Sequence, residues 1–127
     1  MPVFYSKLEK ANPQDRTQTK WYPALKSVGQ AKNKEVSRQL ADETTINPKE
    51  AEVAIYGLIK VAKRLLLSGY TVQLEDLGSF YLTASTTGSD NEADVTAKNI
   101  NNLNVRFRPA ASFKEDIQKA ELRPVRV

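Results

Sequence analysis

The chain has 127 residues and a formal net charge of +4, with 40% hydrophobic and 27% charged residues, which describes one ordinary domain with room for a terminal extension. Because it contains neither cysteine nor histidine, disulfides, thiolate metal sites and the Ser-His-Asp and Cys-His arrangements of nucleophilic enzymes are excluded. No apolar run approaches the roughly 20 residues needed to span a bilayer, and the charged start is unlike a signal peptide, so we expect a cytoplasmic protein.

Residues 1–32 are expected to form a basic extension made of extended chain. Val3, Tyr5 and Lys7 would alternate with Phe4, Ser6 and Leu8 in extended chain at its start, and Pro13 and Pro23 argue against a helix. Residues 12–15, with the sequence Asn-Pro-Gln-Asp, are a turn signal, which predicts two short strands around a loop, the second near residues 20–22. A partly ordered tail is the alternative, but the aromatic residues of this segment favour a packed structure.

Two helices are predicted next along the chain. Asn33 has the character of an N-cap for a short helix that runs through about Glu43. The second helix has a stronger start, because Asn47 can cap it and Pro48 suits the first helical position, and it should end near Ser68. Its apolar residues cover more of the circumference than one packing face needs, so in a chain this small a partner subunit is expected on the second side.

Three antiparallel strands and a last helix complete the predicted order. From β-branched content and alternation, the strands are expected at residues 70–74, 79–85 and 103–108. The polar residues 86–102 between the second and third strands are expected to form a long hairpin connection or flexible arm. Pro109 ends the third strand, and a short helix over about residues 111–120 should bury Phe113 and Ile117.

Two anchors in the sequence carry a resemblance to a known family. The first anchor consists of residues 46–51 (Ile-Asn-Pro-Lys-Glu-Ala), 68–74 (Ser-Gly-Tyr-Thr-Val-Gln-Leu) and 77–80 (Leu-Gly-Ser-Phe). The second anchor consists of residues 107–114 (Phe-Arg-Pro-Ala-Ala-Ser-Phe-Lys). In this order and separation they resemble the HU and integration host factor family of bacterial histone-like DNA-binding proteins, in a subgroup with an N-terminal extension.

The resemblance implies an α+β, IHF-like fold. Two N-terminal helices, a three-stranded antiparallel sheet with a long β-arm and a short C-terminal helix would form an intertwined dimer. Residues 33–127 would be the histone-like DNA-binding domain, with its arm at about residues 86–102, and residues 1–32 would be the extension. The residues expected in the core or the dimer interface are Leu58, Ala62, Leu65, Gly78, Phe80 and Phe107.

The resemblance also implies a function. It indicates a non-enzymatic, architectural DNA-binding protein of the nucleoid, which binds and bends or condenses duplex DNA with low sequence specificity. Its partners would be double-stranded DNA and a second subunit, either itself or a paralogue, without cofactor, metal or small-molecule substrate. By family position, the candidate DNA-binding residues are Lys32, Lys34, Lys98, Arg106, Arg108 and Lys114.

The charge distribution agrees with this function only in part. The excess of Lys and Arg lies in residues 1–34 and 101–127, whereas residues 70–100 hold five acidic residues against one lysine. The tip of the arm, residues 87–94, is acidic and lacks the proline with which family arms wedge between base pairs, so it would repel phosphates. Two hypotheses therefore stay open: a dimer that binds DNA through its sheet and basic extension, or an HU-like dimeric protein-interaction or regulatory module with weak or no DNA binding.

Overall fold

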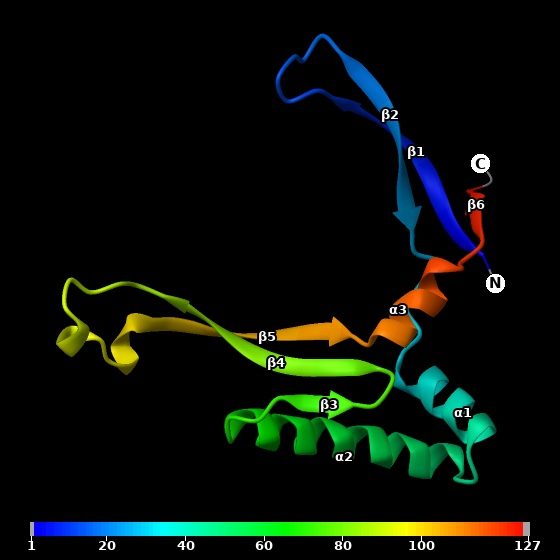
Figure 1. Ribbon diagram of the computed structural model, residues 1–127. Helices are drawn as coiled ribbons and strands as arrows, with labels where there is room; N and C mark the ends of the chain where they lie inside the picture. Colours follow the sequence, from blue (N-terminus) through cyan, green and yellow to red (C-terminus); the bar gives the residue numbers. More distant parts are fainter. Residues whose placement is uncertain (1, 126–127) are drawn as a thin grey trace.

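The computed structural model describes residues 2–125. Within this range three α-helices, two short 3-10 helices and six strands in two sheets follow one another, which confirms the α+β class (Figure 1). The elements are β1 (Val3–Ala11), β2 (Thr19–Lys26), α1 (Asn33–Glu43), α2 (Pro48–Leu67), β3 (Val72–Leu74), β4 (Gly78–Thr86), η1 (Glu92–Asp94), η2 (Ala97–Asn99), β5 (Ile100–Pro109), α3 (Ala111–Gln118) and β6 (Leu122–Pro124).

The first sheet, in the order β2-β1-β6, is made from both ends of the chain. β1 and β2 form the predicted hairpin in antiparallel register. β6, which no sequence pattern predicted, pairs in parallel with the start of β1. Backbone hydrogen bonds from Val3 N–H to the Glu121 carbonyl (2.7 Å) and from Val125 N–H to the Tyr5 carbonyl (2.8 Å) hold it there. Figure 1 shows the hairpin extending away from the helices, with β6 beside its base.

The starts of α1 and α2 are capped in different ways. At α2 the predicted cap is confirmed, because Asn47 Oδ1 accepts a hydrogen bond of 2.9 Å from the Glu50 N–H. At α1 the prediction that Asn33 is the N-cap is wrong, since Lys32 holds that position and Asn33 is the first helical residue. The Asn33 side chain instead accepts a hydrogen bond from the Ser37 hydroxyl at 3.4 Å, so it is directed along the helix and not toward a free backbone N–H.

The end of α2 is closed by Gly69, which lies in the left-handed region at φ 90°. The Tyr70 N–H then donates a hydrogen bond of 3.0 Å to the Leu65 carbonyl oxygen. Because this backbone group belongs to the helix end, β3 begins at Val72 and not at Tyr70 as the sequence predicted.

The second sheet, in the order β3-β4-β5, has an apolar face and a polar face. Val72 lies opposite Phe80 across β3 and β4, and Phe80 lies opposite Phe107 across β4 and β5. Residues directly opposite each other project to the same side, so these three share the apolar face. The Phe80 and Phe107 rings lie 4.8 Å apart between centroids, at an interplanar angle of 41°.

The connection between β4 and β5 is the long hairpin connection that the sequence predicted. The two strands pair as far as Thr86 and Ile100. Beyond them the Asn99 side chain donates hydrogen bonds to the Thr87 carbonyl oxygen and to the Ser89 hydroxyl, both at 2.8 Å. η1 and η2 lie inside this loop, so the arm ends in a loop closed by side-chain hydrogen bonds.

A single copy of the chain encloses a very small core. In residues 2–125 the buried hydrophobic residues are Ala51, Leu66 and Val72. The prediction that the last helix buries Phe113 and Ile117 is wrong within one chain, where these residues are 40% and 58% exposed. The reason is that the described elements leave that side of α3 open. Most of the apolar surface therefore remains uncovered in one copy.

Candidate nucleic-acid interface

The polar face of the second sheet places two predicted DNA-binding arginines together. Arg106 lies opposite Tyr81, and Arg108 lies opposite Ser79, in the pairing of β5 with β4. Because successive residues of a strand project to alternate sides, both arginines lie on the side away from Phe107. We call this surface the arginine face.

The two guanidinium groups of the arginine face are not neutralised by carboxylates of the described chain. The Arg108 guanidinium lies over the Tyr81 ring, with its central carbon 5.3 Å from the ring centroid. This cation–π contact orients the guanidinium and leaves its edge donors available for an anion. Across residues 2–125, neither Arg106 nor Arg108 forms an ion pair with a carboxylate. The two side chains are therefore suited to phosphate contacts.

Neutral polar residues surround the two arginines. The hydroxyl-bearing residues of β4 on this face are Ser79, Tyr81, Thr83 and Ser85. Asn104 of β5 donates a hydrogen bond of 3.2 Å to the Ser85 hydroxyl. Side chains of this kind contact phosphate and sugar oxygens in protein–DNA interfaces. They were not among the predicted site residues, although the polar and apolar alternation of residues 79–85 contains the signal.

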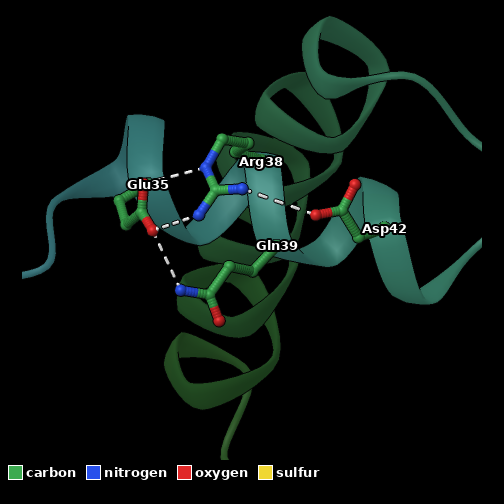
Figure 2. Close-up of polar contacts among 4 residues, drawn as sticks. All are labelled: Glu35, Arg38, Gln39 and Asp42. Atoms are coloured by element: carbon green, nitrogen blue, oxygen red, sulfur yellow. Dashed lines mark hydrogen bonds and ion pairs between the residues drawn. The ribbon is translucent and has the colours of Figure 1, made fainter.

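Arg38 on α1, by contrast, is held by carboxylates of its own helix (Figure 2). Its guanidinium lies 2.6 Å from Glu35 Oε1 and 3.5 Å from Asp42 Oδ2, and Gln39 donates a hydrogen bond of 2.9 Å to Glu35. The hydrogen bonds from Arg38 and then Gln39 lower the pKa of Glu35 to about 2. Because its charge is balanced within the cluster, Arg38 is a poor candidate for a phosphate contact.

The four predicted DNA-binding lysines lie on other elements. Lys32 is the N-cap residue of α1, Lys34 lies in the first turn of that helix, Lys98 lies in η2, and Lys114 lies on α3. All four are exposed. The structure thus brings the two predicted arginines together and distributes the lysines over three other elements, so a part for the lysines in DNA binding stays a prediction.

The loop at the end of the arm, residues 87–99, has acidic side chains at its surface, and we call it the arm loop. Asp90, Glu92 and Asp94 are all exposed, and the last two lie in η1. Asn91 donates a weak hydrogen bond of 3.4 Å to Asp94. Carboxylates repel phosphates, so this loop is not suited to contact the DNA backbone.

The six residues predicted for the core or the dimer interface differ in burial. Those buried or partly buried within one chain are Ala62, Gly78 and Phe80. Those that remain between 37% and 45% exposed are Leu58, Leu65 and Phe107. Leu58 and Leu65 lie on one side of α2 together with Val61, which is also exposed, because these positions follow helical spacing. We call these three α2 residues the open stripe.

Metal-ligating clusters and membrane spans are both missing from residues 2–125. No three or more His, Cys, Asp or Glu side chains of that range come together in a way that could hold a metal ion. Within the same range, the helices are too short or too polar to cross a membrane.

The chain is similar to proteins of one family and to a solved bacterial structure. A family model described as "HU domain fused to wHTH, Ig, or Glycine-rich motif" (HU-HIG) matches residues 1–124. The fold is similar to the crystal structure of a protein from Bacteroides vulgatus ATCC 8482 described as a "Putative bacterial DNA binding protein", with a TM-score of 0.66 and 12% identity. The match covers 96% of this chain and 48% of that one, so this chain spans about half the length of its structural relative. Among curated proteins, no sequence matches it.

Proposed function

The chain belongs to the HU-HIG family, and on that premise we propose that it binds duplex DNA as an architectural protein without enzymatic activity. The observation that carries the proposal is the arginine face, where Arg106 and Arg108 project together and Tyr81 orients one of them. Guanidinium groups that neutralise phosphates release counterions, which supplies affinity with little dependence on base sequence. We therefore propose low sequence specificity.

The binding unit is proposed to be a dimer of this chain with itself or with a paralogue. The open stripe of α2 leaves Leu58 and Leu65 uncovered in one copy, and the core within one chain is very small. Burying one such leucine contributes roughly 1.5–3 kcal/mol. A second subunit over the open stripe would thus supply the core that one chain lacks, and it would bring a second arginine face.

The proposed binding mode is contact with the DNA backbone and not insertion of a wedge. The arm loop contains no proline between residues 87 and 94 and is acidic there. We therefore assign no base-pair intercalation to it. Bending, where it occurs, would come from DNA following the dimer surface, which favours deformable sequences. This role would place the protein on the nucleoid, in the cytoplasm.

The proposal is tested by titrating the protein with random-sequence duplex DNA at several salt concentrations. The wild-type affinity should fall steeply as salt rises. Arg106→Gln combined with Arg108→Gln should make the slope of log K against log salt shallower by about 1.8 for each subunit whose arginine face contacts the duplex, because each lost phosphate contact removes about 0.9.

The matched control for this titration is Arg38→Gln. Arg38 carries the same charge but is already held by Glu35 and Asp42, so its replacement should leave the salt slope unchanged. If the wild-type protein does not bind duplex DNA even at low salt, the proposed function is wrong.

A dimeric protein-interaction or regulatory module is the second candidate function, and the acidic arm favours it. The exposed carboxylates of Asp90, Glu92 and Asp94 are suited to a basic protein surface and unsuited to phosphates. The same titration separates the two candidates. The module predicts dimerisation without salt-dependent affinity for duplex DNA, and the DNA-binding proposal predicts both.

A further inference from the structure

Three lysines of the first sheet lie on the same face, and the register of the β1–β2 hairpin places them there. Lys10 lies directly opposite Lys20, and Phe4 lies directly opposite Lys26. Opposite residues share a side, and positions 4 and 10 of β1 share the same alternation, so all of these residues lie on one face. We call it the basic face, and its three lysines are exposed.

The other face of the same sheet is mainly apolar. Tyr5 lies opposite Leu25, and Glu9 lies opposite Trp21. Trp21 and Leu25 are 67% and 73% exposed. The lysine of β1 on this side, Lys7, has Glu9 as its neighbour on the same side of the same strand. By count, the strands of the hairpin therefore have their excess of positive charge on the basic face, where three lysines have no acidic residue on the same side.

Two lysines of the basic face, Lys10 and Lys20, lie directly opposite each other, and within residues 2–125 all three lysines of this face lack a carboxylate partner. Like charges directly opposite on neighbouring strands are destabilising, and Lys10 and Lys20 are such a pair. In residues 2–125 no lysine of this face forms an ion pair, whereas Arg123 of β6 is paired with Glu121 at 2.7 Å. The Lys10 ammonium lies 5.9 Å from the Tyr22 ring centroid, a contact that orients the charge without neutralising it. A bound anion would remove the repulsion.

The basic face is hollowed by two open grooves. One groove, of about 670 Å³, is lined by Lys10, Lys20 and Tyr22 together with residues of the hairpin turn. The other, of about 800 Å³, is lined by Lys26 and Arg123 near the base of the hairpin. Positively charged side chains therefore line both grooves, one near the hairpin turn and the other near the base of the hairpin.

We propose that the basic face is a second DNA contact surface, which binds backbone phosphates of the duplex that flanks the segment on the arginine face. This inference rests on the proposed function. Lys20 and Lys26 are six residues apart on β2, which is about 20 Å at about 3.3 Å per residue and corresponds to the rise of about six base pairs. Figure 1 shows the hairpin directed away from the second sheet, so one duplex must be long to reach both surfaces.

The test compares two duplex lengths in salt titrations of the full chain. One duplex has about one helical turn of about 10 base pairs, and the other has about three turns. Lys10→Gln combined with Lys20→Gln should make the salt slope on the long duplex shallower by about 1.8 for each subunit whose basic face contacts the duplex, and it should leave the slope on the short duplex unchanged.

Lys7→Gln is the matched control for Lys10→Gln, because both remove one positive charge from β1 on opposite faces of the sheet. The Lys10→Gln slope on the long duplex should change by about 0.9 for each subunit whose basic face contacts the duplex, and the Lys7→Gln slope should not change. Equal far-UV circular dichroism of all variants establishes that the fold is kept.

Three outcomes would overturn the inference. If the lysine pair variant keeps the wild-type slope on the long duplex, the basic face does not contact DNA, and the proposed function still stands. An equal effect of Lys7→Gln would mean that net charge and not the face determines the slope. Absence of any wild-type DNA binding at low salt would overturn the proposed function together with the inference.

Discussion

Gly78 of β4 and Arg108 of β5 approach so closely that a Cβ atom on Gly78 would overlap the Arg108 carbonyl oxygen. The same Cβ atom would lie 2.9 Å from carbons of the Phe107 ring. Gly78 also has a φ of 146°, which L side chains rarely adopt. This glycine therefore sets the distance between β4 and the strand that carries the arginine face.

Gly78→Ala should destabilise the fold and weaken DNA binding, because β5 must shift to admit the methyl group. Backbone strain of this kind costs roughly 1–3 kcal/mol. Urea denaturation measures the loss, and Gly88→Ala is the control because a Cβ atom there would meet nothing within 4 Å. An unchanged unfolding midpoint for Gly78→Ala would contradict the close approach of the two strands.

Much of the fold could be predicted from local signals in the sequence. The start of α2 at Pro48 follows from its cap, and its end at Gly69 follows from the conformational freedom of glycine. The alternation of polar and apolar residues in 103–108 also predicts that Arg106 and Arg108 lie on one side of their strand, which is where the pairing of β5 with β4 has them. Each of these signals depends on only a few neighbouring residues, so it can be recognised in the sequence without knowledge of tertiary packing.

β6 and the basic face could not be predicted, because both depend on long-range pairing. Residues 122–124, Leu-Arg-Pro, have no alternation of their own and become a strand only beside β1. Lys10 and Lys20 share a face only because the hairpin turn fixes their register. A slip of one residue would move every β2 side chain to the other side.

Asn47→Ala and Asn33→Ala should differ in their effect on stability, although both residues have the sequence character of a cap. Asn47 accepts the Glu50 N–H, and loss of such a cap costs about 0.5–2 kcal/mol. Asn33 is not a cap. Its replacement removes the long hydrogen bond to the buried Ser37 hydroxyl and also removes a buried side-chain nitrogen that has no partner, and because these two effects oppose each other the loss should be smaller than at Asn47. Chemical denaturation of both variants measures this difference, and equal losses would contradict the assignment of the caps.

The Glu35 carboxyl should titrate with a pKa of about 2, below its ordinary value of 4.5, because Arg38 and Gln39 donate hydrogen bonds to its charged form. A lowered folded-state pKa means that the cluster contributes to stability above about pH 4.5 and loses this contribution as the pH falls through about 2. Carboxyl carbon NMR measures the pKa directly.

Variants of the same cluster identify the cause of the low Glu35 pKa. Arg38→Gln should raise it toward 4.5, because the largest of its causes is the hydrogen bond from Arg38. Asp42→Asn should leave it low, since Asp42 contacts the arginine and not Glu35. An ordinary Glu35 pKa in the wild-type protein would show that the contact does not persist in solution.

Leu65→Asp should shift the protein from dimer to monomer in sedimentation equilibrium. Leu65 belongs to the open stripe, and a carboxylate there would have to be desolvated when the second subunit covers it. Leu67→Asp is the matched control, because Leu67 lies two positions further along α2, about 200° around the helix, and is 83% exposed. A Leu65→Asp protein with the mass of the wild-type assembly would contradict the placement of the interface.

The wild-type protein gives a second measurement of the same interface that does not depend on whether a variant folds. Association stabilises the folded state by mass action, so the melting temperature should rise with protein concentration. The described part of one chain buries few hydrophobic residues, so the stability of the fold should depend on the core that two chains form together. A melting temperature independent of concentration, together with a solution mass of one 14.2 kDa chain, would show that the open stripe is not covered by a second copy.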